Sequence, residues 1–170
     1  ISRWMRDLKN NVKETKLAFD LRMFGISGHV SNTKRGSYQA AFDGGINETI
    51  YDKTTIIKEA AEQFKQMFGY TSYTFIAPNY TWDAEVEKAL AENGVKWLQG
   101  TNTQIHSRDY GGKLKIKRHY LGQRNKFEQQ YLIRNCYFEP TSNPNKDWVN
   151  NCLHDIKVSF RWKKPAIVST

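Results

Sequence analysis

The sequence predicts an α/β domain in which mainly parallel strands alternate with helices. The chain has 170 residues, one domain's worth, and its 39% hydrophobic and 14% aromatic content is typical of a globular protein. Residues 52–98 have the pattern of a helix, a strand, a helix and a strand with short connections, which is the usual order in parallel sheets. Residues 131–168 add a further strand, helix and strand. We therefore expect residues 1–170 to form a single α/β domain.

Two short helices are expected in the first 25 residues, which are dense in helix formers. Leu17, Leu21 and Phe24 lie at the i, i+4 and i+7 spacing of an apolar stripe, and a glycine follows as the expected helix end. Residues 25–45 are rich in Gly, Ser and Asn and are predicted to be mainly loop, with a helical turn or two around residues 38–42. Sites are often placed on loops of this kind.

The clearest helix is predicted at residues 52–68, because apolar side chains share one face and charged side chains share the other. Asp52 or Thr54 is expected to cap its start, and Gly69 follows its end. Residues 73–77 are β-branched and aromatic, which predicts a buried strand. The side chains expected to face inward from the helix are Ile56, Ile57, Ala60, Ala61, Phe64, Met67 and Phe68.

A second helix is predicted after this strand. Thr81 and Asp83 are expected to open it, and Asn93 with Gly94 is expected to end it. Residues 95–98 then predict another short strand. The inward side chains of this helix are expected to be Val86, Ala89 and Leu90.

Residues 100–130 lack a clear period and are predicted to be irregular. Seven basic residues crowd this stretch, and aromatic side chains are interleaved with them. One interpretation is a solvated loop. The other is a segment that follows a phosphate backbone, with Tyr110 and Tyr120 as stacking platforms.

The last third of the chain predicts a strand at residues 131–138 and a long amphipathic helix. Asn143 is expected to cap this helix, with Pro144 at its first position. Pro165 ends the helix, and residues 166–168 predict one more buried strand.

Charge is the compositional feature that stands out. Lys and Arg number 26 against 17 Asp and Glu, which gives a formal net charge of +9 and attracts anions of any kind. No apolar run reaches about 18 residues, so no membrane span is predicted. Cys136 and Cys152 lack metal-binding spacing and are expected to be buried or idle thiols. The chain does not begin with Met, so we expect position 1 to be an interior point of a longer gene product. The compartment stays open, with the cytoplasm slightly favoured.

The common catalytic motifs are absent from the sequence. It contains no P-loop, dinucleotide fingerprint, nucleophile elbow or HExxH pattern. The four histidines are too scattered to give a local metal-ligand spacing. The sequence therefore assigns no metal ligand and no catalytic residue.

Polar and aromatic residues follow the strand predicted at residues 73–77. This strand ends at Pro78, and Asn79, Tyr80 and Trp82 come next. Ligands bind at the carboxyl ends of the strands in parallel α/β folds, so these three residues are candidates for a binding site. The alternative is a turn in which Tyr80 and Trp82 complete the core.

The same region carries a family resemblance. Residues 64–100, with Pro78-Asn79-Tyr80 at their centre, resemble the middle of polysaccharide deacetylase-like proteins, in particular a bacterial branch. These proteins are relatives of the family-4 carbohydrate esterases. The similarity covers nearly the whole chain and continues in residues 118–126, 134–136, 139–140, 143–149 and 160–167.

The resemblance implies an irregular or partial β/α barrel and a divalent metal, commonly zinc, held by one Asp and two His. Such a metal activates water against an acetyl carbonyl. The chain departs from this pattern, because Ile76 stands where the family has an Arg that orients the catalytic carboxylate. The Asp-rich first motif, the His-x-x-x-His motif and the closing His are also absent. The chain is thus similar to the interior of such a protein and lacks its metal ligands.

The function implied is that of a polysaccharide deacetylase-like, carbohydrate-active protein, which hydrolyses acetyl groups on a glycan if the parent chain supplies the metal site. Aromatic faces suit sugar C–H surfaces, amides bind hydroxyls, and arginines suit acidic groups on a glycan. The alternative is a non-catalytic basic module that binds an anionic glycan or nucleic acid, of which nucleic acid is less favoured. The candidate substrate-binding residues are Asn79, Tyr80, Trp82, Gln99, Arg118, His119, Arg134 and Asn135.

Overall fold

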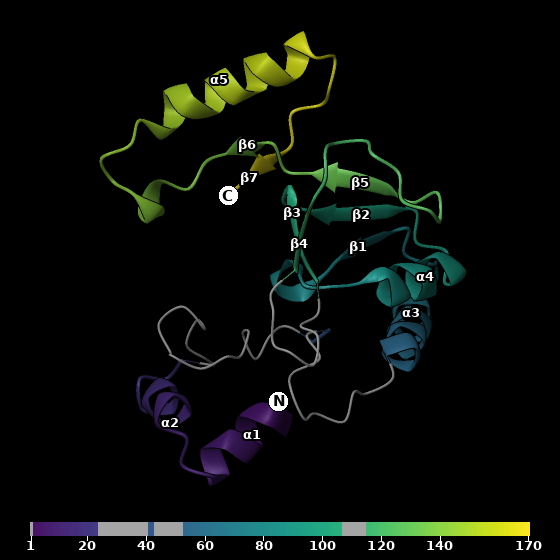
Figure 1. The fold of residues 1–170 in the computed structure, drawn as a ribbon, viewed down its shortest axis with the longest axis vertical. Coiled ribbons are helices and arrows are strands. Elements are labelled where there is room, and N and C mark those ends of the chain that lie inside the picture. Colours follow the sequence, from purple (N-terminus) through teal and green to yellow (C-terminus); the bar gives the residue numbers. More distant parts are fainter. Residues whose placement is uncertain (1, 24–40, 43–52, 107–114) are drawn as a thin grey trace.

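The computed structural model describes residues 2–23, 41–42, 53–106 and 115–170. Within these residues the strands form a three-stranded parallel sheet and two further pairs; α3 and α4 lie together beside the sheet, and α5 lies by β6 and β7 (Figure 1). The predicted mixed α/β class is confirmed. The described strands do not close into a barrel, because the three-stranded sheet and the two pairs remain separate.

The two short helices expected at the start of the chain are present as α1 (Ser2–Lys9) and α2 (Lys13–Asp20). The predicted apolar stripe is wrong as an inward face, since Leu17 is 49% exposed and Leu21 is 59% exposed. Thr15 and Ala18 are buried instead, because small side chains allow close packing there. The expected helix end at residues 24–25 lies outside the described residues, as do most of the predicted loop and turn that follow.

Helix α3 (Lys53–Phe68) confirms the predicted helix, but only part of its expected inward face is buried. Ile57 is in the core, whereas Met67 is 70% exposed and Phe68 is 56% exposed. The reason is length: α3 has 16 residues and packs on α4, which has 9 and leaves the end of α3 uncovered. Thr54 lies inside the helix and is not its cap, and residue 52 lies outside the described residues.

Helix α4 (Ala84–Glu92) follows the prediction closely. Asp83 is its N-cap and accepts hydrogen bonds from the backbone N–H groups of Glu85 and Val86, each at 3.1 Å. Gly94 ends the turn with a φ of 85°, a conformation that glycine adopts without strain. The predicted inward side chains are all buried, namely Val86, Ala89 and Leu90.

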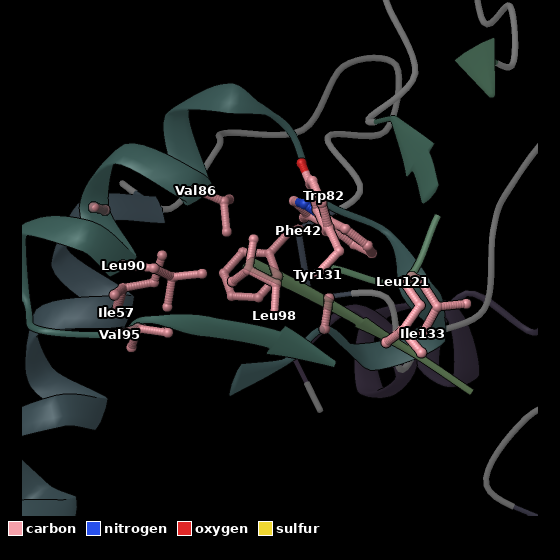
Figure 2. Close-up of a cluster of buried hydrophobic side chains, with 12 residues drawn as sticks. Phe42, Ile57, Trp82, Val86, Leu90, Val95, Leu98, Leu121, Tyr131 and Ile133 are labelled. Atoms are coloured by element: carbon pink, nitrogen blue, oxygen red, sulfur yellow. The ribbon is translucent and has the colours of Figure 1, made fainter. Parts of the chain in front are cut away.

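The parallel sheet has the order β1 (Thr74–Ile76), β2 (Trp97–Gly100), β5 (Gln130–Ile133). Its core-facing side chains include Leu98, Tyr131 and Ile133, which gather with Val86 and Leu90 from α4 (Figure 2). The predicted burial of β1 is wrong: this strand forms one edge of the sheet, and both its end residues are exposed.

The region predicted to be irregular contains an antiparallel strand pair, β3 (Thr103–His106) and β4 (Lys115–Arg118). Sequence reasoning missed β4 because all four of its side chains are exposed, so no alternation of apolar and polar residues marks it. Residues 107–114, which include Tyr110, lie outside the described residues.

The strand predicted at residues 131–138 is divided into β5 and β6 (Cys136–Tyr137), and β6 pairs in parallel with β7 (Val168–Ser169). Helix α5 (Trp148–Arg161) packs on β6 and begins later than predicted, with Asp147 as its N-cap. The Asn143 side chain accepts from the Asn145 N–H, a local turn that competes with helix formation.

Two further predictions concern burial near the end of the chain. Val168 is 45% exposed, so the last strand is not fully buried as predicted. Cys136 and Cys152 are both buried and free, which confirms the expectation of buried thiols.

Candidate functional site

A strained turn lies at the carboxyl end of β1. It is the short 3-10 helix η1 (Pro78–Tyr80), in which Asn79 has a φ of 51° and Tyr80 a φ of 53°. Residues other than glycine rarely adopt this left-handed backbone conformation. Backbone strain of this kind is found mainly at functional sites. The hydrogen bonds that hold the turn include one from the Thr81 hydroxyl to the Asn79 carbonyl at 3.2 Å and one from the Trp82 N–H to the Ile105 carbonyl at 3.0 Å.

Two sequence-predicted residues, Tyr80 and Arg134, meet at this end of the sheet, and the exposed Asn79 directly precedes Tyr80. We call Asn79, Tyr80 and Arg134 the strand-end group. Arg134 follows β5, and its Nη1 donates to the Tyr80 hydroxyl at 3.4 Å. The Arg134 backbone N–H donates to the Gly100 carbonyl at 2.9 Å, which fixes it to the end of β2. A Cβ on Gly100 would lie 3.5 Å from Tyr80 Cδ1, so the Tyr80 ring lies directly over this glycine.

Tyr137 lies beside the strand-end group, although sequence reasoning did not single it out. Partial burial raises the pKa of Tyr137, and the nearby Tyr80 raises it further, whereas Arg134 lowers it. The carboxyl end of the sheet thus carries the phenols of Tyr80 and Tyr137, the guanidinium of Arg134 and the exposed residue Asn79. The signal for Tyr137 in the sequence was its place near the end of the predicted strand at residues 131–138.

A second set of side chains is buried near this turn, and we call it the buried polar cluster. Glu87 Oε1 accepts a hydrogen bond from Trp82 Nε1 at 3.1 Å and another from the Tyr131 hydroxyl at 2.7 Å. Gln104 Nε2 donates to the Trp82 carbonyl at 3.0 Å. The cluster consists of Trp82, Glu87, Gln104, His119 and Tyr131, each less than a tenth exposed.

His119 is held in this cluster in its neutral form. Its ring stacks on Tyr131 with 3.7 Å between centroids, and its Nε2 lies 2.6 Å from Gln104 Oε1. An amide oxygen only accepts, so Nε2 carries the proton. Nδ1 is buried and has no hydrogen-bond partner among the described residues. Burial lowers the pKa of His119, and the positive charge of Lys117 lowers it further.

Glu87 and Gln104 were not predicted as part of a site. Glu87 lies on the same side of α4 as Val86 and Leu90, so a carboxylate at a core position was a signal available in the sequence. Burial raises the pKa of Tyr131, and its hydrogen bond to Glu87 raises it further, so the phenol stays protonated and donates. Gln104 lies in a strand that was not predicted, and no sequence pattern marked it.

The other predicted site residues lie in different surroundings. Gln99 is half-buried on β2, and Arg118 is exposed on β4. Both amide hydrogens of Asn135 are used within the fold, since its Nδ2 donates to Ser159 Oγ and to the Pro165 carbonyl, each at 3.0 Å. The structure therefore brings Asn79, Tyr80 and Arg134 together, and it places Trp82 and His119 among the buried side chains.

The donor set for the metal that the resemblance implied does not form among the described residues. No group of three or more His, Cys, Asp and Glu side chains in this part of the chain is arranged to hold a metal ion. Glu87 Oε1 already accepts from Trp82 and Tyr131, and His119 Nε2 lies 2.6 Å from Gln104 Oε1. The one Asp and two His that the resemblance implied do not come together among the described residues.

Polar and aromatic groups at the carboxyl ends of parallel strands are in the usual position of a ligand-binding site in β/α enzymes. The comparison with family models agrees: glycosyl hydrolase family 57 matches residues 38–141, more than half of the chain. The chain belongs to this family, and thus to a class of carbohydrate-active proteins. No match was found among curated proteins or among solved structures. None of the described helices is long and apolar enough to cross a membrane.

Proposed function

We propose that the strand-end group binds a glycan and that the chain is the substrate-recognising part of a hydrolase that acts on that glycan. The observation that carries this proposal is the meeting of Tyr80 and Arg134 above Gly100, in a chain of a glycosyl hydrolase family. The family match supports carbohydrate as the substrate class. Experiments described below distinguish hydrolysis of a glycosidic bond from hydrolysis of an acetyl group.

Each member of the strand-end group has a distinct role in this proposal. The Tyr80 ring offers an apolar face to sugar C–H groups, and its hydroxyl is positioned by Arg134. Arg134 is half-buried and offers its remaining N–H groups to sugar hydroxyls or to an acidic group. The exposed Asn79 amide both donates and accepts, as recognition of a hydroxyl requires. The backbone strain at residues 79–80 fixes these groups before the ligand binds.

Hydrolysis of acetyl groups, rather than of glycosidic bonds, is the finer form of the proposal that the sequence resemblance supports. It needs a metal, and the described side chains do not provide the ligands. We therefore derive no chemical step through a metal. Metal content after purification and release of acetate from acetylated glycans, measured side by side, separate this form from glycosidic hydrolysis.

Binding measurements on four variants test the proposal. We expect Tyr80→Ala and Arg134→Gln to weaken oligosaccharide binding by about tenfold or more, because each removes a direct contact. Asn79→Ala should weaken it less. The matched control is Tyr120→Ala, since Tyr120 is 67% exposed and lies outside the strand-end group. Calorimetry with a panel of neutral, N-acetylated and acidic oligosaccharides measures the effect. Equal affinity of the parent chain and Tyr80→Ala would exclude the site.

A basic module that binds an anionic glycan is a second candidate, favoured by strand β4. All four residues of β4 are exposed, and three of them are Lys115, Lys117 and Arg118. No described carboxylate pairs with Lys117 or Arg118. An edge strand rich in lysine also protects a sheet from aggregation, so the charge needs a functional test.

Chromatography on heparin and on single-stranded DNA, at several salt concentrations, provides that test. If β4 binds anionic glycans, replacing Lys117 and Arg118 with Gln should lower the salt concentration of elution from heparin and reduce its salt dependence. Stronger retention on DNA than on heparin would favour nucleic acid. Unchanged elution of the double variant from both columns would exclude β4 as a binding site for anionic polymers.

A further inference from the structure

The parallel sheet is covered unequally on its two faces. Leu98 and Tyr131 face the core that contains α4 (Figure 2). Phe75 is partly buried and packs against the same core. Among the described residues the opposite face is less buried, since Thr74, Ile76 and Trp97 are exposed, although parallel sheets are usually buried on both sides. Leu132, on the same face, is partly buried and packs against the core. On that face the register aligns two rows of side chains, Thr74, Trp97 and Gln130 in the first, and Ile76, Gln99 and Leu132 in the second.

An aromatic pair, Tyr73 and Trp97, lies at the amino end of the sheet. Tyr73 is 51% exposed and Trp97 is 36% exposed, and their rings meet edge to face with 6.4 Å between centroids. The backbone N–H groups of Lys96 and Trp97 both donate to the Tyr73 carbonyl, at 2.9 Å and 3.0 Å. The two rings are therefore attached to a fixed backbone, and little conformational freedom remains to be lost when a ligand binds.

Polar groups surround the aromatic pair. Thr74 and Gln130 are the register partners of Trp97 on its two sides, so the indole lies between a hydroxyl and an amide. Gln130 Nε2 donates to the Gly122 carbonyl at 3.3 Å, which orients this amide. The Lys96 ammonium lies 5.1 Å from the centre of the Tyr73 ring. An aromatic surface with hydroxyl, amide and ammonium groups at its rim matches a sugar ring, which has apolar C–H faces and hydroxyls around its edge.

We propose that Tyr73 and Trp97 form a second glycan-binding surface, at the opposite end of the sheet from the strand-end group. The strands of the sheet run from this end towards η1, which places the two sites at opposite ends of the same three strands (Figure 1). The inference rests on the proposed carbohydrate function and adds a place where a long polysaccharide is held while another part of it occupies the strand-end group. A short oligosaccharide fills only one of the two sites.

Affinity electrophoresis in gels that contain soluble starch, glycol chitin or alginate tests this surface, with the full chain as the sample. We expect at least one polysaccharide to retard the parent chain, and Trp97→Ala and Tyr73→Ala to weaken that retardation about tenfold in apparent Kd. Trp97→Phe keeps an aromatic face and should restore most of the binding. The matched control is Phe68→Ala, because Phe68 is 56% exposed but belongs to a separate aromatic cluster with Phe64 and Tyr70.

Failure of this inference is distinguishable from failure of the proposed function. Tyr80→Ala should weaken binding of short oligosaccharides, whereas Trp97→Ala should leave that binding unchanged. Full retardation of Trp97→Ala and Tyr73→Ala by the polysaccharide that retards the parent would overturn the second surface and leave the strand-end group intact. No retardation of the parent by any of the three polysaccharides would overturn it as well. A concentration-dependent dimer that Trp97→Ala abolishes, without any loss of retardation, would assign the face to a second copy of the chain instead.

Discussion

At the scale of single residues, the buried polar cluster explains why an unusual set of polar side chains is tolerated in the core. Glu87 is only 3% exposed, yet its Oε1 satisfies two buried donors, Trp82 Nε1 and the Tyr131 hydroxyl. A buried donor without a partner costs free energy, so one carboxylate oxygen stabilises two aromatic side chains. The position of Trp82 then fixes the chain that follows the strained turn at residues 79–80.

Replacement of Glu87 should therefore destabilise the fold strongly. We expect Glu87→Ala to lower the free energy of unfolding by about 2–4 kcal/mol, because it leaves two buried donors unpaired. Glu87→Gln keeps an oxygen acceptor and should cost less. Glu92→Ala, an exposed position on the same helix, is the control and should change stability by less than about 0.5 kcal/mol. Urea unfolding followed by tryptophan fluorescence measures all three; a Glu87→Ala variant as stable as the control would contradict the account.

The neutral state of His119 predicts how stability changes with pH. Burial lowers the pKa of this imidazole in the folded chain, while the unfolded chain keeps a value near the ordinary one of about 6.5. The unfolded state thus binds the proton more readily, and stability should fall as the pH drops below about 6.5. Unfolding free energies between pH 7.5 and about 5 should show a flatter slope for His119→Gln. The control is the exposed His154→Gln, and a slope as steep in His119→Gln as in the parent chain would show that another group is responsible.

At the scale of elements, Asp83 joins the starts of α3 and α4. Its Oδ1 caps α4, and its Oδ2 forms an ion pair with the buried Lys53 of α3. A buried ion pair contributes specificity more than stability, yet removing one partner leaves the other in a poor environment. The junction accounts for the packing of two helices that the sequence predicted separately.

We expect Asp83→Ala to lower the free energy of unfolding by about 2–4 kcal/mol, through loss of the cap and of the partner of a buried ammonium. Asp83→Asn keeps much of the cap, so the difference between the two variants isolates the effect of the cap. The matched control is Asp147→Ala, which removes the exposed N-cap of α5 and should cost less. Thermal unfolding of the variants measures these losses. Equal losses for Asp83→Ala and Asp147→Ala would show that the ion pair adds nothing.

At the scale of the whole molecule, local patterns predicted the fold well where they coincided with packing. The period of α4, its Asp83 cap and its Asn93-Gly94 end agree with the structure, because this helix is packed on the sheet as its pattern indicates. The prediction failed where an apolar side chain met no neighbour, as for Met67 and Phe68, or where exposed side chains formed a strand, as in β4. The apolar periodicity of a sequence indicates which side chains can be buried. Whether they are buried depends on the elements that pack against them in the folded chain.

The candidate site was predictable in part for the same reason. Asn79 and Tyr80 follow a strand that the sequence indicated, so their place at a strand end was accessible. Arg134 was expected inside the strand predicted at residues 131–138, and it lies at a strand end because that strand is divided into β5 and β6. The contact of Tyr80 with Arg134, the left-handed turn and the link from Glu87 to Tyr131 join residues far apart in the chain. No local pattern encodes these long-range contacts.

The central claim is that the strand-end group binds a glycan. A titration of the isotopically labelled chain with disaccharides, followed by backbone amide shifts, tests it most directly. The account predicts saturable shifts at residues 79–82, 100–102 and 134–138, absence of these shifts in Tyr80→Ala, and an unchanged spectrum for α1 and α2. Saturable shifts confined to other parts of the chain, or equal shifts in the parent and in Tyr80→Ala, would contradict it.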